Sequence, residues 1–200
     1  MLRKIAPSAL FALFLTTVPA FAHVGQGHVE TFATGFFHPL GGIDHVLAMV
    51  AVGLYAASLG GAALLLVPSA FVGTMIVGGL IGYGGIGLPY VEQVIGLSVV
   101  VMGLAIALGV KLPTAMAMAL VGAFALFHGH AHGSEGAELA SFLPYAAGFV
   151  IATSLLHCAG IALGLVLDRL GRTPSDILRR SAGTVGALAG VSLMAGWLTV

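Results

Sequence analysis

Charged side chains are scarce in this chain of 200 residues: Lys, Arg, Asp and Glu make up 7% of it, while 59% of its residues are hydrophobic. Soluble domains carry about 25% charged residues, so the composition predicts a membrane protein. The formal net charge is zero with His counted as neutral, which offers no basic surface to nucleic acid. The single cysteine, Cys158, excludes an intrachain disulfide. A G-x-x-x-x-G-K-[ST] loop is also missing, which excludes ATP hydrolysis at a site of that type.

Residues 1–22 have the three parts of a secretory signal peptide. Arg3-Lys4 is a basic start, Leu10 to Val18 is an apolar stretch, and Ala20-Phe21-Ala22 is an A-x-A cleavage site. The alternative is an uncleaved first helix, but the apolar stretch ends too early for a membrane span. Cleavage would leave His23 at the mature N-terminus.

The mature chain, 23–200, is predicted to be one domain with six apolar runs. Each run is near the roughly 20 residues that cross about 30 Å of hydrocarbon. The runs cover about 42–59, 62–83, 91–110, 113–130, 142–167 and 180–199. The predicted fold is therefore all-α: a polytopic membrane helix bundle of six transmembrane helices after a cleavable signal peptide.

The basic residues of the mature chain all fall in the third and fifth breaks between these runs. They are Lys111, Arg169, Arg172, Arg179 and Arg180. A cleaved signal places residue 23 outside, so the odd-numbered breaks face the cytoplasm and the positive-inside rule is met. The acids Glu92 and Glu135 fall on the opposite, outer side.

Two groups of polar residues lie at the outer ends of the first and fourth runs. The first group is His38, Asp44 and His45, and the second is His128, His130, His132 and Glu135. A carboxylate near the bilayer centre costs roughly 2.5–3.5 kcal/mol. Polar and ionisable residues beside apolar runs therefore indicate a function. Because both groups are predicted at the same membrane face, we expect one site that draws on both.

Spacing within the groups favours metal binding. His128 and His132 are one helical turn apart and share a helix face. His38 and His45 are seven residues apart and would also share a face if the helix of the first run began before His38. Asp44 could bind a metal directly or orient a neighbouring imidazole. Imidazole and carboxylate ligands suit Ni, Zn, Cu(II) or Co and suit Mg or Ca poorly. The alternative is a set of hydrogen-bonded histidines at the wet interface.

Two further histidines are candidates outside these groups. His157 lies in the middle of the fifth run, beside Cys158 and one turn from Thr153. An ionisable group at that depth is a functional candidate by default, here a relay ligand below the outer site. The alternative is an interhelical hydrogen bond to a carbonyl or hydroxyl. His23 could capture ions at the mature N-terminus.

Both groups match signatures of a known family. His38-Pro39-Leu40-Gly41-Gly42-Ile43-Asp44-His45 resembles the His-x5-Asp-His signature of the HupE/UreJ nickel permeases. Phe127-His128-Gly129-His130-Ala131-His132-Gly133-Ser134-Glu135 resembles that family's second signature, Phe-His-Gly-x-x-His-Gly-x-Glu. The resemblance covers essentially the whole chain and carries over His38, Asp44, His45, His128, His132 and Glu135 as important residues. His130 falls on a variable position, and His157 lies outside both signatures.

The resemblance implies secondary transport of Ni²⁺, with Co²⁺ as a second cargo in some members, for hydrogenase or urease maturation. It implies a multi-pass protein of the bacterial inner membrane, so that the outer side is the periplasm. We expect Ni²⁺ as transported substrate, no organic cofactor, and a path between runs one, four and five. Histidine must be neutral to bind a metal and its reference pKa is near 6.5, so uptake should weaken when the outer medium is acidified.

Two other classes stay open at this point. A membrane-embedded zinc hydrolase could use a His/Asp site, but the chain lacks H-E-x-x-H, and Glu135 and Asp44 are already assigned to metal binding. A b-type haem protein would need paired histidines at staggered depths. Energy coupling, metal preference and oligomeric state are not decided by the sequence.

Overall fold

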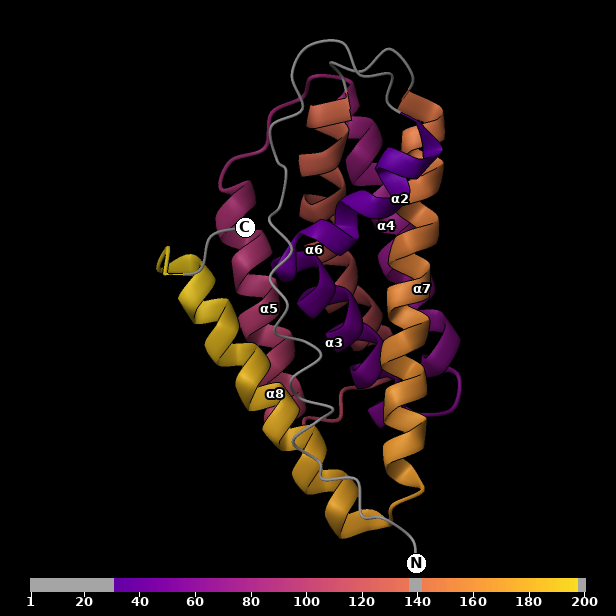
Figure 1. The fold of residues 1–200 in the computed structure, drawn as a ribbon, viewed down its shortest axis with the longest axis vertical. Coiled ribbons are helices and arrows are strands. Elements are labelled where there is room, and N and C mark those ends of the chain that lie inside the picture. Colours follow the sequence, from indigo (N-terminus) through magenta and orange to yellow (C-terminus); the bar gives the residue numbers. More distant parts are fainter. Residues whose placement is uncertain (1–30, 137–141, 198–200) are drawn as a thin grey trace, which may run out of the picture.

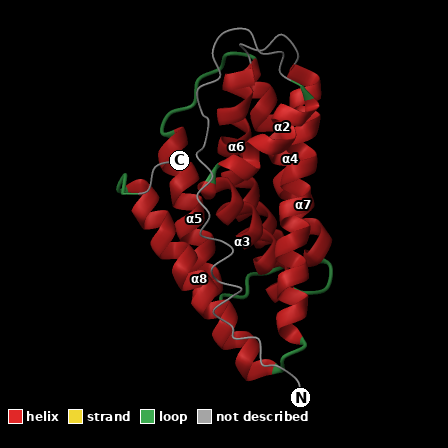
Figure 2. Cartoon of the chain, in the orientation of Figure 1, coloured by secondary structure: helices red, strands yellow, loops and turns green. Residues whose placement is uncertain are grey.

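The computed structural model describes residues 31–136 and 142–197, and all of their regular elements are α-helices (Figures 1 and 2). They are α2 (Phe32–Gly41), α3 (Ile43–Leu59), α4 (Ala63–Tyr83), α5 (Val91–Ala107), α6 (Thr114–Gly136), α7 (Phe142–Asp168) and α8 (Arg172–Met194). The all-α prediction is confirmed. The predicted signal peptide and His23 lie outside the described residues.

Each of the six predicted apolar runs overlaps one helix, from α3 to α8. By length and composition, α4, α6 and α7 could each cross a membrane alone, and α2 with α3 could do so as a bent pair. α5 is apolar but has only 17 residues. The described part of the chain thus contains three or four candidate spans, against six predicted.

A helix that the sequence analysis did not predict precedes the first apolar run. The side chains of Thr31 and Thr34 cap its N-terminus reciprocally, and α2 then runs to Gly41. The chain breaks at Gly42, and α3 continues at an angle of 84° to α2. The condition under which His38 and His45 would share one helix face is therefore not met, because they lie on two helices of different direction.

Glycines allow these helices to approach closely. A Cβ on Gly129 would lie 1.9 Å from the carbonyl oxygen of Met75, and one on Gly133 would lie 2.0 Å from that of Gly79. The glycines of the second signature therefore press α6 against α4. In the same way, a Cβ on Gly53 would lie 2.1 Å from the carbonyl oxygen of His157, so α3 and α7 touch along their backbones. α3 lies in the centre and packs against α2, α4, α5, α7 and α8.

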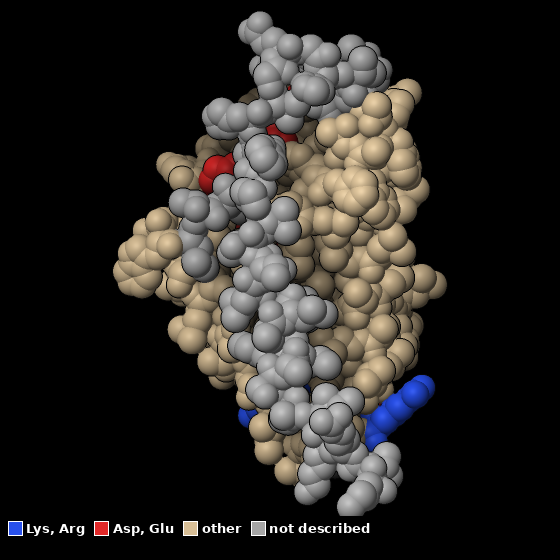
Figure 3. All heavy atoms as spheres, viewed as in Figure 1, with Lys and Arg blue, Asp and Glu red and all other residues tan. Residues whose placement is uncertain are grey.

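The two ends of the bundle differ in charge. At one end, the ammonium group of Lys111 donates a hydrogen bond to the carbonyl of Ser58, and Arg179 pairs with Asp168 at 2.8 Å. On the face drawn in Figure 3, Lys and Arg are visible near one end and Asp and Glu near the other. The breaks that carry the basic residues thus lie together, as the sequence predicts.

Candidate metal centre

The two signatures meet at the end of the bundle where α2 crosses α7. A Cβ on Gly35 would lie 1.9 Å from the carbonyl oxygen of Tyr145, so α2 lies directly on the backbone of α7. This contact holds His38 beside α6, where its ring centroid is 4.8 Å from that of His132. The first turn of α3 brings Asp44 and His45 to the same place. The predicted convergence of the two groups is therefore seen in the structure.

Three buried imidazoles, those of His45, His128 and His132, form the inner part of the site. They are 7%, 0% and 7% exposed. The Nε2 atom of His45 lies 2.6 Å from Nε2 of His132 and 3.4 Å from Nδ1 of His128. We call these three residues the inner triad.

Carboxylates on the far sides of two of these rings determine where the ring protons lie. His45 Nδ1 is 3.1 Å from Asp44 Oδ1, which also accepts the backbone N–H of His45 at 2.8 Å. His132 Nδ1 is 3.2 Å from Glu135 Oε2. An ionised carboxylate only accepts hydrogen bonds, so both Nδ1 atoms carry the proton. The Nε2 atoms of His45 and His132 are then left with lone pairs.

A serine determines the tautomer of the third ring. The Ser98 hydroxyl donates to the carbonyl of Ile95 at 2.6 Å. Its oxygen therefore accepts from His128 Nε2, which is 3.0 Å away, and His128 Nδ1 is left with a lone pair. Ser98 is only 2% exposed. It was missed by the sequence analysis, because a single hydroxyl in an apolar run carries no recognisable signal.

The Nε2 lone pair of His45 thus faces the lone pairs of both His132 and His128, and a cation between these nitrogens would remove their mutual repulsion. A ring oriented on its far side by a carboxylate or hydroxyl is the usual arrangement of metal-binding histidines. Nitrogens held at about 2.0–2.1 Å from one ion lie roughly 3 Å apart, close to the observed separations of 2.6 and 3.4 Å. The site can hold a proton or one divalent ion.

A second, more exposed group lies above the inner triad. It comprises His38, His132 and Glu135, whose ligand atoms lie within 4.8 Å of one another. Glu135 Oε2 is 3.6 Å from His38 Nε2. The side chains of His38 and Glu135 are 40% and 58% exposed, so we call this group the rim. His132 belongs to both groups, with Nδ1 facing the rim and Nε2 facing the inner triad.

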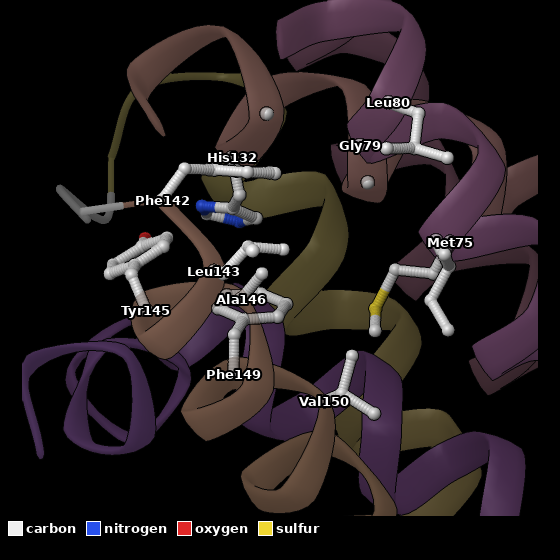
Figure 4. Close-up of a pocket in the computed structure, with 13 residues that line it drawn as sticks. Met75, Gly79, Leu80, His132, Phe142, Leu143, Tyr145, Ala146, Phe149 and Val150 are labelled. Carbon is white, nitrogen blue, oxygen red and sulfur yellow. The ribbon is translucent and has the colours of Figure 1, made fainter. Parts of the chain in front are cut away.

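Two cavities border the site. One of about 150 Å³ lies between α4, α6 and α7 and is mostly apolar. In Figure 4 the His132 ring lies in its lining beside Phe142, Tyr145 and Phe149. The other, of about 180 Å³, is lined by Asp44, Glu92 and Gln93 among others. Glu92 was considered only for its charge at the outer side, and its shared cavity with Asp44 was missed.

Two of the remaining candidates lie elsewhere, and the third, His23, is outside the described residues. His130 is buried, but its Nε2 donates to the carbonyl of Ile86 at 2.7 Å, outside the cluster. His157 is buried in the middle of α7, where its ring touches Phe71 with centroids 4.9 Å apart. The structure therefore brings together six of the nine sequence candidates.

Comparisons with known proteins agree with the signatures. The family described as "HupE / UreJ protein" matches residues 11–193. Protein HupE of Rhizobium leguminosarum bv. viciae is 47% identical over 189 residues, which cover 94% of this chain and 96% of that protein. No solved structure matches the chain. The chain therefore belongs to the HupE/UreJ family.

Proposed function

We propose that the protein is a secondary transporter that moves Ni²⁺, with Co²⁺ as a second cargo, across the bacterial inner membrane. The observation that carries this proposal is the position of His45 Nε2, which lies 2.6 Å from His132 Nε2 and 3.4 Å from His128 Nδ1 in the inner triad. Membership of the HupE/UreJ family supports nickel as the cargo. Neutral imidazoles suit Ni²⁺ and Co²⁺, and no organic cofactor or enzymatic step is part of the proposal.

The rim and the inner triad act in sequence. The Glu135 carboxylate and the His38 imidazole receive the hydrated ion at the surface. His45, His128 and His132 then replace part of its water shell, while Asp44 orients His45. Binding must be moderate, because an ion that is held too tightly is not released.

In this proposal the signal peptide 1–22 is removed, and 23–200 forms one domain that spans the membrane six times. α5 is about 26 Å long at 1.5 Å per residue, close to the hydrocarbon thickness of about 30 Å. The clustering of Lys111 and Arg179 at the end opposite to the site supports a periplasmic site and mature N-terminus.

Transport is tested with the protein reconstituted in liposomes that contain a Ni²⁺-sensitive dye. We expect His45→Ala and His132→Ala each to lower the uptake rate by about tenfold or more, because each removes a ligand or its orientation. His130→Gln is the matched control, since His130 bonds to Ile86 outside the cluster, and it should retain uptake.

Equal uptake by wild-type protein and by His132→Ala would contradict the site. Hydrolysis of a lipid amide or peptide without movement of metal would instead favour the zinc hydrolase. Size-exclusion profiles of all variants establish that the proteins compared are folded.

A further inference from the structure

We propose a second cation site, formed by His157 and Thr153 on α7, which an ion occupies after it leaves the inner triad. This inference rests on the proposed transport function. The site lies deep in the bundle, and the Phe71 ring separates it from the inner triad.

Three buried polar atoms of His157 and Thr153 lack hydrogen-bond partners among the described residues. His157 is 1% exposed and Thr153 is 0% exposed. Neither ring nitrogen of His157 nor the hydroxyl oxygen of Thr153 has a hydrogen-bond partner within residues 31–136 and 142–197. The interhelical hydrogen bond considered as an alternative for His157 is therefore not seen. Leaving a buried polar group unpaired costs about 1–3 kcal/mol, so these atoms call for a ligand.

Ser154, the residue after Thr153, shows that a hydroxyl group in α7 can find a hydrogen-bond partner within the helix. The hydroxyl of Ser154 donates to the carbonyl of Val150 in α7 at 2.7 Å, which is the ordinary solution for a hydroxyl in an apolar helix. Thr153 does not make this bond. Thr153 and His157 are one turn apart and share a face of α7, so both can contribute to one ligand.

Phe71 contacts the rings of both His157 and His128. Its ring centroid lies 4.9 Å from that of His157 and 5.7 Å from that of His128, and the residue is 1% exposed. A single aromatic ring thus contacts both sites. In this proposal an ion that moves inward from His128 to His157 passes beside the Phe71 ring.

The donor atoms of His157 and Thr153 are all uncharged in the neutral side chains. One imidazole and one hydroxyl supply no negative charge, whereas the outer site has the carboxylates of Asp44 and Glu135. A divalent ion held by His157 and Thr153 keeps part of its water shell and binds weakly, as an intermediate site on a transport path requires. The imidazole favours Ni²⁺ and Co²⁺ over Mg²⁺ and Ca²⁺.

Binding at this site is measured with Co²⁺, whose visible spectrum reports nitrogen ligands. The double variant His45→Ala/His132→Ala removes the inner triad, and we expect it to bind one remaining ion weakly. Adding His157→Asn or Thr153→Val should abolish this binding, whereas adding Ser154→Ala should leave it unchanged.

Transport separates this inference from the proposed function. The single variant His157→Asn, with the inner triad intact, should lower the Ni²⁺ uptake rate in liposomes by about tenfold. Its high-affinity Co²⁺ spectrum should be unchanged. Unchanged uptake in His157→Asn and Thr153→Val would overturn the second site and leave the transporter intact. Absence of uptake and of Co²⁺ binding in wild-type protein would instead refute the proposed function. If His157→Asn does not fold, the uptake rate of the nearly isosteric Thr153→Val variant tests the second site.

Discussion

At the scale of single residues, metal binding depends on which ring nitrogens carry protons. His132 illustrates this, because its Nδ1 lies 3.2 Å from Glu135 and its Nε2 lies 2.6 Å from Nε2 of His45. The same ring therefore contacts both the rim and the inner triad. His132 thus links the two groups, with its Nδ1–H bonded to Glu135 in the rim and its Nε2 lone pair facing His45 in the inner triad.

Ser98→Ala tests the assigned tautomer of His128. Loss of the hydroxyl removes the acceptor for His128 Nε2–H, so the ring can rotate or change tautomer, and we expect Co²⁺ affinity to fall by about tenfold. Titration followed by visible spectroscopy measures the effect. Ser134→Ala is the control, since that hydroxyl donates to the carbonyl of His130 at 2.9 Å. Equal affinity of the two variants would show that Ser98 does not orient the ring.

The sequence predicted the histidines and acids of the site but not the residues that position them. His38, Asp44 and His132 stand out because charged or ionisable groups are rare beside apolar runs. Ser98 and Phe71 do not stand out in the sequence, because a hydroxyl or an aromatic ring in an apolar helix usually only packs against neighbouring helices. Their roles arise from contacts between helices, which a local pattern does not contain.

At the scale of elements, the break between α2 and α3 shapes the site. A Cβ on Gly42 would lie 2.7 Å from Asp44 Oδ1 and 3.2 Å from His45 Nδ1. The absence of a side chain at this position leaves room for the contact between Asp44 and His45. The neighbouring Gly41 has no atom within 4 Å of a Cβ built on it.

These two glycines provide a matched pair of variants. Gly42→Ala should displace the Asp44 carboxylate and lower Co²⁺ affinity by about tenfold, while Gly41→Ala should leave affinity unchanged. The thermal unfolding temperature should change little in either variant, because the atoms met by the new Cβ of Gly42→Ala are side-chain atoms that can move. A similar loss of affinity in both variants would mean that Gly42 acts through backbone flexibility alone.

The helices themselves were predicted better than their ends. The fourth apolar run was predicted to end near 130, but α6 continues to Gly136. The sixth was predicted to start near 180, but α8 begins at Arg172. In both cases polar residues end the apolar run without ending the helix. α2 was missed because the segment is too short to give a reliable hydropathy signal.

At the scale of the whole molecule, the site lies at one end of the bundle and the basic residues at the other. His130 contacts the loop after α4 at the end that carries the site, while Lys111 contacts the carbonyl of Ser58 at the opposite end. The alternation of breaks in the sequence was sufficient to predict this. The path was expected between runs one, four and five, which correspond to α3, α6 and α7. This expectation did not include α4, whose Phe71 ring lies beside His128 and His157, because such a contact depends on how the helices pack.

The most direct test of the central claim is X-ray absorption spectroscopy of the purified protein loaded with one equivalent of Ni²⁺. We predict three imidazole nitrogens at about 2.0–2.1 Å from the metal, from His45, His128 and His132, with oxygen ligands completing the shell. His130→Gln should leave this spectrum unchanged. A shell of oxygens alone, without the multiple scattering of imidazole rings, would contradict the claim that the two signatures join to bind the ion.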